Sequence, residues 1–227
     1  HDALFPMMYF QGNNFYPFAL DWKENDGKRW IIPGLGIYFL SPREQDWPLD
    51  EIVRQIHFTR QIKLNGQAYF RNRFLLDNTK GVLDELEENF YTYPALIPPM
   101  TWSDSIPPSV PSHPSVQQIA NGKLRMSWQA SADNSNQSVV YHLYGSDTYP
   151  VDIKQPQNLI ATHLIANEYE YTAKLPWLQK RYFAVTAADR FGNESAPLTL
   201  NTVSDMDIPL LNKGNMLYLP EIKDAQT

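Results

Sequence analysis

DALFPMMYF, at residues 2–10, is a continuous apolar run of strand length. A strand that is apolar at every position is buried on both faces, which is typical of the parallel sheets of α/β folds. Two later runs, GLGIYFL (34–40) and GQAYF (66–70), have the same character. The pattern predicts three strands of a parallel sheet.

The segments between these runs have the periodicity of helices. LDEIVRQIHFTRQIKL (49–64) carries one apolar stripe and then a charged face, and Asp50 and Glu51 in its first turn suit the helix dipole. TKGVLDELEENF (79–90) and the shorter FALDWKEN (18–25) predict two more helices. The alternating order of strands and helices favours right-handed crossover connections.

A proline-rich stretch divides the chain. Proline recurs seven times between Pro94 and Pro114, a density that blocks both helix and central strand. We expect this stretch to be extended and fairly stiff. The predicted divisions are an α/β part at 1–100, a linker at 101–114, an all-β part at 115–204 and a tail at 205–227.

Short strands dominate the part after the linker. In KLRMSWQA (123–130), Leu124, Met126 and Trp128 alternate with polar residues, which indicates a strand with one buried face. Five further segments have strand character: 138–146, 159–164, 167–173, 181–189 and 197–203. They predict an antiparallel β-sandwich. In RFGN we expect Asp189 and Asn193 to form a turn rather than to bind a ligand.

Composition excludes several kinds of site. The chain has 25 Asp plus Glu against 19 Lys plus Arg and no basic stripe, which disfavours nucleic acid as a partner. It has no cysteine, and its five histidines are scattered, so we expect neither a metal nor a cofactor. No apolar run has membrane-spanning length and no signal peptide is visible. We expect a soluble chain, already mature or cut from something longer.

Two stretches in the all-β part carry a family resemblance. RYFAVTAADRFGNESAP (181–197), with KLRMSWQAS upstream, resembles a fibronectin type III domain of the bacterial extracellular kind, over about 108–204. The resemblance implies core positions at Trp128, Phe183, Val185 and Ala187. Tyr182 is a candidate for the family's tyrosine corner, although alternation from Val185 puts Phe183 on the core face.

A second resemblance covers residues 2–102. DALFPMMYFQ, GLGIYFLSP, DEIVRQIHFTRQ, GQAYFRNRFLL and FYTYPALIPPMTW are similar, in order, to the final part of a bacterial glycosyl-hydrolase-like barrel family, domain of unknown function 187. The resemblance implies a partial (β/α)8 barrel consisting of the last three βα units, with five strands upstream of this chain. It also implies an extracellular or periplasmic location and carbohydrate as the partner.

Active sites of such barrels lie at the carboxyl ends of the strands. The residues there that suit substrate binding are Tyr9, Gln11, Asn13, Tyr38 and Arg71. Aromatic faces and amide or charged groups are the chemistry that sugars require. The alternative is that they are ordinary solvated loop residues.

Glu44 is the candidate catalytic carboxylate. Glycoside hydrolysis generally needs two carboxylates, and Glu44 and Asp46 share the loop SPREQDWP. Their spacing does not ensure that both face a cleft, and the alternative is that the neighbouring Arg43 pairs with them. The family resemblance instead implies catalytic carboxylates upstream of this chain.

Two functions from different classes remain open. One is the carboxyl-terminal part of a secreted glycoside hydrolase-like enzyme, inactive by itself. The other is a non-catalytic module for binding carbohydrate or protein, or for adhesion. Exposed sheet edges predict either a homodimer or cover by the tail, in which Leu210–Leu219 has a hairpin signal.

Overall fold

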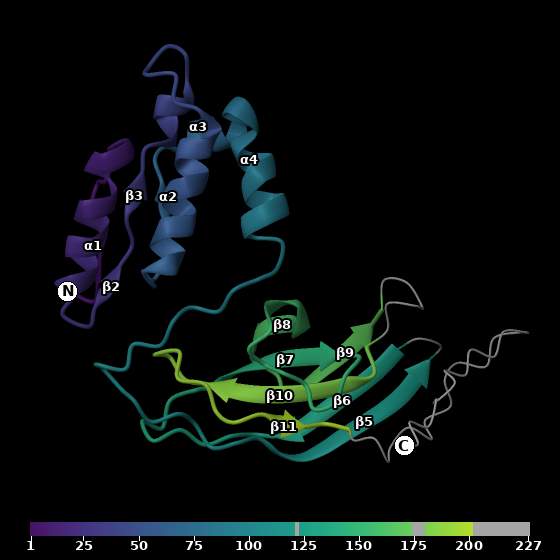
Figure 1. Ribbon diagram of the computed structural model, residues 1–227. Coiled ribbons are helices and arrows are strands. Elements are labelled where there is room, and N and C mark those ends of the chain that lie inside the picture. The colour runs from purple at the N-terminus through teal and green to yellow at the C-terminus, as the bar shows by residue number, and fades with distance from the viewer. Residues whose placement is uncertain (121–122, 174–179, 202–227) are drawn as a thin grey trace, which may run out of the picture.

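The computed structural model describes residues 1–120, 123–173 and 180–201. Figure 1 shows two bodies: helices and short strands form the first, and a β-sandwich forms the second. The segment after α4 joins them. Within the described residues, no helix is long and apolar enough to cross a membrane. The predicted hairpin in the tail lies outside the described residues.

Three extended segments lie side by side in the first body. β1 (Ala3–Leu4) pairs in parallel with β2 (Trp30–Ile31), and β3 (Gly34–Leu35) pairs in parallel with β4 (Ala68–Tyr69). Backbone hydrogen bonds continue the first ladder, because Gly34 donates to Pro6 O and Met8 donates to Gly34 O. The parallel pairing predicted from the apolar runs is therefore present, although the regular strands are much shorter than the runs.

The prediction of one strand over 34–40 is wrong beyond Leu35. Ile37–Leu40 forms the 3-10 helix η2. Here the Tyr38 N–H still donates to Phe70 O across the ladder, whereas the Phe39 N–H turns back to Gly36 O. An apolar run in the sequence indicates burial but not conformation, so a buried strand and a buried turn have the same pattern.

The helices lie where the periodicity places them, with different ends. α1 (Tyr16–Glu24) has a proline in its first turn, and α2 (Leu49–Gln61) corresponds to the predicted helix 49–64. The single helix predicted over 79–90 is wrong. Residues 79–90 instead form three consecutive elements: the 3-10 turn η3 (Thr79–Gly81), α4 (Val82–Glu85) and the π-helical turn η4 (Leu86–Phe90). A short helix, α3 (Asn72–Leu76), precedes them.

Backbone conformation explains the broken helix. Lys80 and Gly81 have φ of 54° and 78°, in the left-handed region, which an α-helix cannot contain. The helical pattern of 79–90 directs Val82, Leu83, Leu86 and Phe90 inward, and all of these except the half-buried Leu83 are buried. Val82, Leu86 and Phe90 join a core whose other members are Met8, Phe15, Ala19, Leu35, Ile37, Leu40, Trp47, Ile52, Ile56 and Phe74.

The second body is the predicted antiparallel sandwich. One sheet has the order β11-β10-β7-β8 and the other β5-β6-β9. The strands are β5 (Ser112–Ala120), β6 (Lys123–Gln129), β7 (Val140–Ser146), β8 (Leu159–Leu164), β9 (Glu168–Thr172), β10 (Tyr182–Ala188) and β11 (Leu198–Thr199). β5 begins inside the segment expected to be linker.

Both faces of the larger sheet are covered. Trp128, Phe183, Val185 and Ala187 lie between the sheets, as expected. Tyr182 points to the opposite face, where it joins a separate cluster with Tyr144, Val151, Leu159 and Ala184. Leu96 from the segment after α4 packs against that cluster.

The proline-rich segment contacts both bodies. Trp102 donates through Nε1 to the Asp2 carboxylate at 3.1 Å, and its ring centre lies 5.7 Å from that of Trp30. Met100 donates to Phe191 O at 2.7 Å. Two nearby residues thus join the segment to both bodies, Trp102 to the helical body through its side chain and Met100 to the sandwich through a backbone hydrogen bond.

The turn predicted in RFGN is confirmed. Asp189 Oδ1 accepts from the backbone N–H groups of Phe191 and Asn193, both at 2.8 Å, and Gly192 has φ of 80°. Asn193 also donates to Asp104 O at 3.0 Å. The turn therefore serves a second purpose, which is to hold the proline-rich segment.

Candidate functional site

An aromatic cluster lies where the three parallel segments end. The ring centres of Tyr9 and Phe70 are 5.3 Å apart in a stacked arrangement, and each lies 5.7 Å from the ring of Tyr38 in an edge-to-face arrangement. Aromatic rings prefer these two geometries because of their quadrupoles. One ring comes from each of three segments that are distant in sequence, so the parallel pairing creates the cluster.

Two glycines make room for Tyr9. A Cβ atom on Gly34 would lie 3.2 Å from Tyr9 Cε1, and one on Gly36 would lie 3.3 Å from Tyr9 Cβ. Both distances are shorter than ordinary van der Waals contact. The glycines of GLGIYFL therefore allow the backbone of β3 to approach the Tyr9 ring closely.

The cluster is partly open to solvent. Phe70 is 46% exposed, whereas Tyr9 and Tyr38 are half-buried. Burial raises the pKa of both tyrosines, and for Tyr38 the neighbouring Tyr9 and Glu44 raise the pKa further. Both phenols thus stay protonated at neutral pH. The cluster presents an apolar ring beside two hydroxyl groups.

Side chains of helix α2 hold the loop that follows Tyr9 through hydrogen bonds to its backbone. Glu51 Oε1 accepts from the Gly12 N–H at 3.0 Å, and Gln55 Nε2 donates to Phe10 O at 2.9 Å. Gln55 also donates to Glu51 at 2.9 Å. These bonds fix the backbone on either side of Gln11, while Gln11 and Asn13 themselves remain exposed around the 3-10 turn η1 (Gly12–Asn14).

Glu51 is a charged group almost without solvent contact. Burial acts to raise its pKa, but hydrogen bonds from Gly12, Gln55 and Arg54 outweigh burial and hold the pKa below its usual value. Arg54 approaches to 2.7 Å from the solvent side. Glu51 is therefore an ionised support of the loop.

Glu44 lies on the exposed loop between η2 and α2. Its backbone N–H donates to Ser41 O at 3.0 Å, and its carboxylate is near enough to Tyr38 to raise that pKa. Within the described residues, Glu44 forms no ion pair with Arg43. Glu44 and Arg43 are therefore not ion-paired in this structure.

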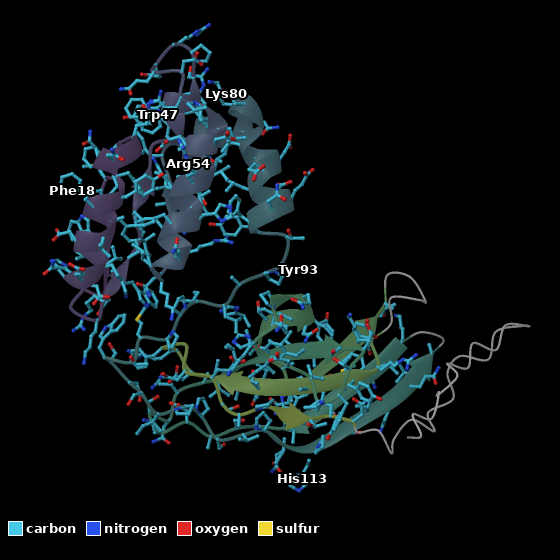
Figure 2. All side chains as sticks on the ribbon, viewed as in Figure 1. Phe18, Trp47, Arg54, Lys80, Tyr93 and His113 are labelled. Carbon is cyan, nitrogen blue, oxygen red and sulfur yellow. The ribbon has the colours of Figure 1, made fainter. Side chains whose placement is uncertain are left out.

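Asp46 is engaged elsewhere. Lys80 Nζ donates to its carboxylate at 2.6 Å and to Trp47 O at 2.7 Å, and Figure 2 shows Lys80 and Trp47 close together at one end of the helical body. Glu44 and Asp46 thus have different surroundings although they are two residues apart.

Arg71 follows Phe70 and precedes α3. It is exposed, and its guanidinium carbon lies 5.4 Å from the ring centre of Phe74, a cation–π geometry. The structure therefore brings Tyr9 and Tyr38 into contact, and it leaves Gln11, Asn13, Glu44 and Arg71 exposed on loops that leave the same segments.

The chain was compared with family models and with curated proteins. No family model matches the chain. The chain is similar to a glycosyl hydrolase. It is 29% identical over 205 residues to "Glycosyl hydrolase YngK" of Bacillus subtilis. The match covers 86% of this chain, which spans 39% of the length of that relative. The two family resemblances in the sequence remain predictions.

A structural comparison adds little. Domains A168–A170 of titin superpose with a TM-score of 0.29 and 14% identity, over 40% of this chain and 29% of the titin chain. A TM-score this low supports no conclusion about the fold. Among the residues that the structure describes, no group of three His, Cys, Asp or Glu side chains is arranged to hold a metal ion.

Sequence reasoning missed Phe70, Glu51 and Gln55. Phe70 is the last residue of the apolar run 66–70, so the pattern places it in the strand and not in the site. Glu51 and Gln55 are both buried, and they are one helical turn apart on α2 beside Ile52 and Ile56. Two polar residues at this spacing next to an apolar stripe are a visible signal of a buried polar contact, because such groups need partners.

Proposed function

We propose that the cluster of Tyr9, Tyr38 and Phe70 binds carbohydrate as one wall of the substrate cleft of a glycoside hydrolase-like protein. The observation that carries the proposal is the meeting of three rings at the same ends of three parallel segments. Ligand sites of α/β folds lie at those ends. The similarity to a Bacillus glycosyl hydrolase supports the same reading.

Each group has a role that its chemistry suits. The exposed ring of Phe70 stacks against the C–H face of a sugar, and the protonated hydroxyls of Tyr9 and Tyr38 donate to sugar oxygens. Three exposed side chains reach the remaining hydroxyls: Gln11, Asn13 and Arg71. Within this proposal the three segments are the last three βα units of a (β/α)8 barrel, the sandwich is fibronectin type III-like, and the protein is extracellular or periplasmic.

Glu44 is a carboxylate close enough to Tyr38 to raise its pKa, and it forms no ion pair among the described residues. In the proposed reaction it acts as one of the two carboxylates of a glycoside hydrolase, which lie about 5 to 9.5 Å apart. Asp46 is paired with Lys80, and Glu51 is committed to the loop. Because this leaves one free carboxylate beside the cluster, binding without catalysis is the second candidate function.

The test has a binding arm and a hydrolysis arm. Neutral oligosaccharides are titrated into the chain by NMR, and the proposal expects shifts at Tyr9, Tyr38 and Phe70. Phe70→Ala should weaken binding about tenfold, which corresponds to loss of one stacking contact. Leu76→Ala, at a more exposed apolar position on α3, is the matched control and should change nothing.

Hydrolysis is measured on the gene product that contains this chain. Release of reducing sugar that falls more than about a hundredfold in Glu44→Gln supports the catalytic role, since general acid–base groups contribute at least that much. Unchanged release in Glu44→Gln, with weaker substrate binding in Phe70→Ala, favours binding alone. Oligosaccharide shifts confined to the sandwich would reject the strand-end site.

A further inference from the structure

A second cleft lies between the two bodies, away from the aromatic cluster. It has a volume of about 530 Å³ and is lined on one side by the segment that leaves η4 and on the other by the loop before β8. Figure 2 shows Tyr93 on this segment, between α4 and the sandwich. The cleft therefore has one wall from each body.

The wall on the helical body is fixed by hydrogen bonds and ring contacts. Tyr91 shares a 2.9 Å hydrogen bond with Tyr69 and donates to Gln67 Oε1 at 2.9 Å. The Arg60 guanidinium carbon lies 5.3 Å from the Tyr91 ring centre, and Arg60 donates to Phe90 O at 2.8 Å. Arg60 and Tyr91 are thus held in place before any ligand binds.

The wall on the sandwich is fixed as well. Leu96 and Ile153 pack against the buried cluster that contains Tyr144 and Leu159. The loop from Asp152 to Asn158 is closed by the Lys154 N–H, which donates to the Asp152 carboxylate at 2.9 Å, and by the Asn158 side chain, which donates to Asp152 O. The loop backbone therefore presents the Lys154 side chain from a defined position.

Three side chains on these walls have no partner within the described residues. The Tyr93 ring is 52% exposed and makes no ring contact or hydrogen bond there. The Lys154 ammonium forms no ion pair, and the Asn89 amide forms no hydrogen bond, in that part of the chain. A free aromatic face, a free amide and a free cation in one cleft match the groups of a sugar acid.

The charged residues that line the cleft indicate which class of sugar it fits. The cleft lining includes Arg60 and Lys154, and none of the described lining residues is Asp or Glu. The chain as a whole has a net charge of −6, so this local excess of positive charge contrasts with its surroundings. A carboxylate on the ligand complements both cations.

We propose that this cleft is a second carbohydrate site that binds oligosaccharides containing uronic acids. The Tyr93 ring stacks on a sugar face, Asn89 bonds hydroxyl groups, and Arg60 and Lys154 bind the uronate carboxylate. This site is independent of the strand-end cluster, so either site can fail without the other.

The experiment titrates the whole chain with oligogalacturonate, oligomannuronate and oligoglucuronate, each beside its methyl ester. At least one acidic oligosaccharide should bind, its methyl ester should bind about tenfold more weakly, and affinity should fall as salt is raised. Tyr93→Ala and Lys154→Gln should each weaken binding about three- to tenfold, whereas Tyr93→Phe should bind like the unmodified chain.

Matched controls locate the site. Lys123→Gln removes an exposed lysine on β6 and should leave binding unchanged. Phe70→Ala reports on the strand-end cluster and should leave the preference for acid over methyl ester in place, which separates this cleft from that cluster. Binding to none of the three acidic oligosaccharides would overturn the proposal. So would equal binding of acid and ester, or loss of binding in Phe70→Ala but not in Tyr93→Ala.

Discussion

The carboxylate of Glu51 accepts a 3.0 Å hydrogen bond from the backbone N–H of Gly12, which lies 39 positions earlier in the chain. The Glu51 side chain is 1% exposed, so the bond joins α2 to the loop of the candidate site through the core. A buried charge is tolerated only where hydrogen bonds compensate its desolvation. The position of the loop and the ionisation of Glu51 are therefore coupled.

Stability in acid should depend on this coupling. The pKa of folded Glu51 is held below its usual value, so Glu51 contributes stability above its unfolded pKa. That contribution is lost as pH falls through the folded pKa. Glu51→Gln should lower the free energy of unfolding at pH 7 by about 1–3 kcal/mol and flatten its decline in acid. Urea unfolding followed by circular dichroism from pH 7 to about pH 3 measures both.

Glu87→Gln is the control, because Glu87 is exposed on η4. It should leave the unfolding curves nearly unchanged. A Glu51→Gln curve parallel to that of the unmodified chain at every pH would show that Glu51 is not an ionised support.

The Gln55 amide should keep the loop closed. Gln55→Leu keeps the volume but removes the side-chain donor to Phe10 O and one of the three donors to the Glu51 carboxylate, at a cost of about 1–3 kcal/mol. Amide hydrogen exchange at residues 10–14 should become faster by at least tenfold. Gln61→Leu, at the exposed end of α2, is the comparison and should leave exchange at residues 10–14 unchanged.

The orientation of the two bodies should depend on Trp102. Its indole donates to Asp2, packs edge-on against Trp30 and lies 5.0 Å below the Arg29 guanidinium. Trp102→Ala removes all three contacts, worth about 1–3 kcal/mol together. Small-angle X-ray scattering should then report a larger radius of gyration. Ile106→Ala, in the same segment and 57% exposed, should give the scattering of the unmodified chain.

Two glycines with the same backbone conformation allow a matched comparison. Gly192 and Gly81 have φ of 80° and 78°, but only Gly192 is crowded, with Ile97 O 3.3 Å from a built Cβ. Gly81→Ala should cost about 1–2 kcal/mol from the left-handed conformation alone. Gly192→Ala should cost more, because the added methyl pushes away the proline-rich segment. Equal losses in thermal unfolding of the two bodies would contradict the crowding.

Pattern reasoning succeeded where structure is local. Alternation in residues 123–129 correctly placed Met126 and Trp128 in the core, because each strand residue alternates between faces. Helical periodicity likewise placed α2 and the inward face of 82–90. The short turn at Asp189 was predictable for the same reason, since its hydrogen bonds span at most four residues.

The candidate site was predicted only in part. Tyr9 and Tyr38 were chosen because both follow an apolar run, and parallel pairing brings such ends together. The sequence did not reveal that Phe70 completes the cluster, that Asp46 is bound by Lys80, or that the strand ends at Leu35. Each depends on a neighbour distant in sequence.

The sequence by itself determined which segments are apolar, how they alternate and where the turn at Asp189 lies, because these properties follow from side-chain polarity and backbone preference over a few residues. The tertiary structure decided which polar groups are buried and what they hold. From the sequence, Glu51 is an ordinary carboxylate in the first turn of a helix; in the structure it accepts a hydrogen bond from the Gly12 N–H. From the sequence, Tyr93 is an ordinary residue near the end of the α/β part; in the structure the sandwich supplies the opposite wall of its cleft.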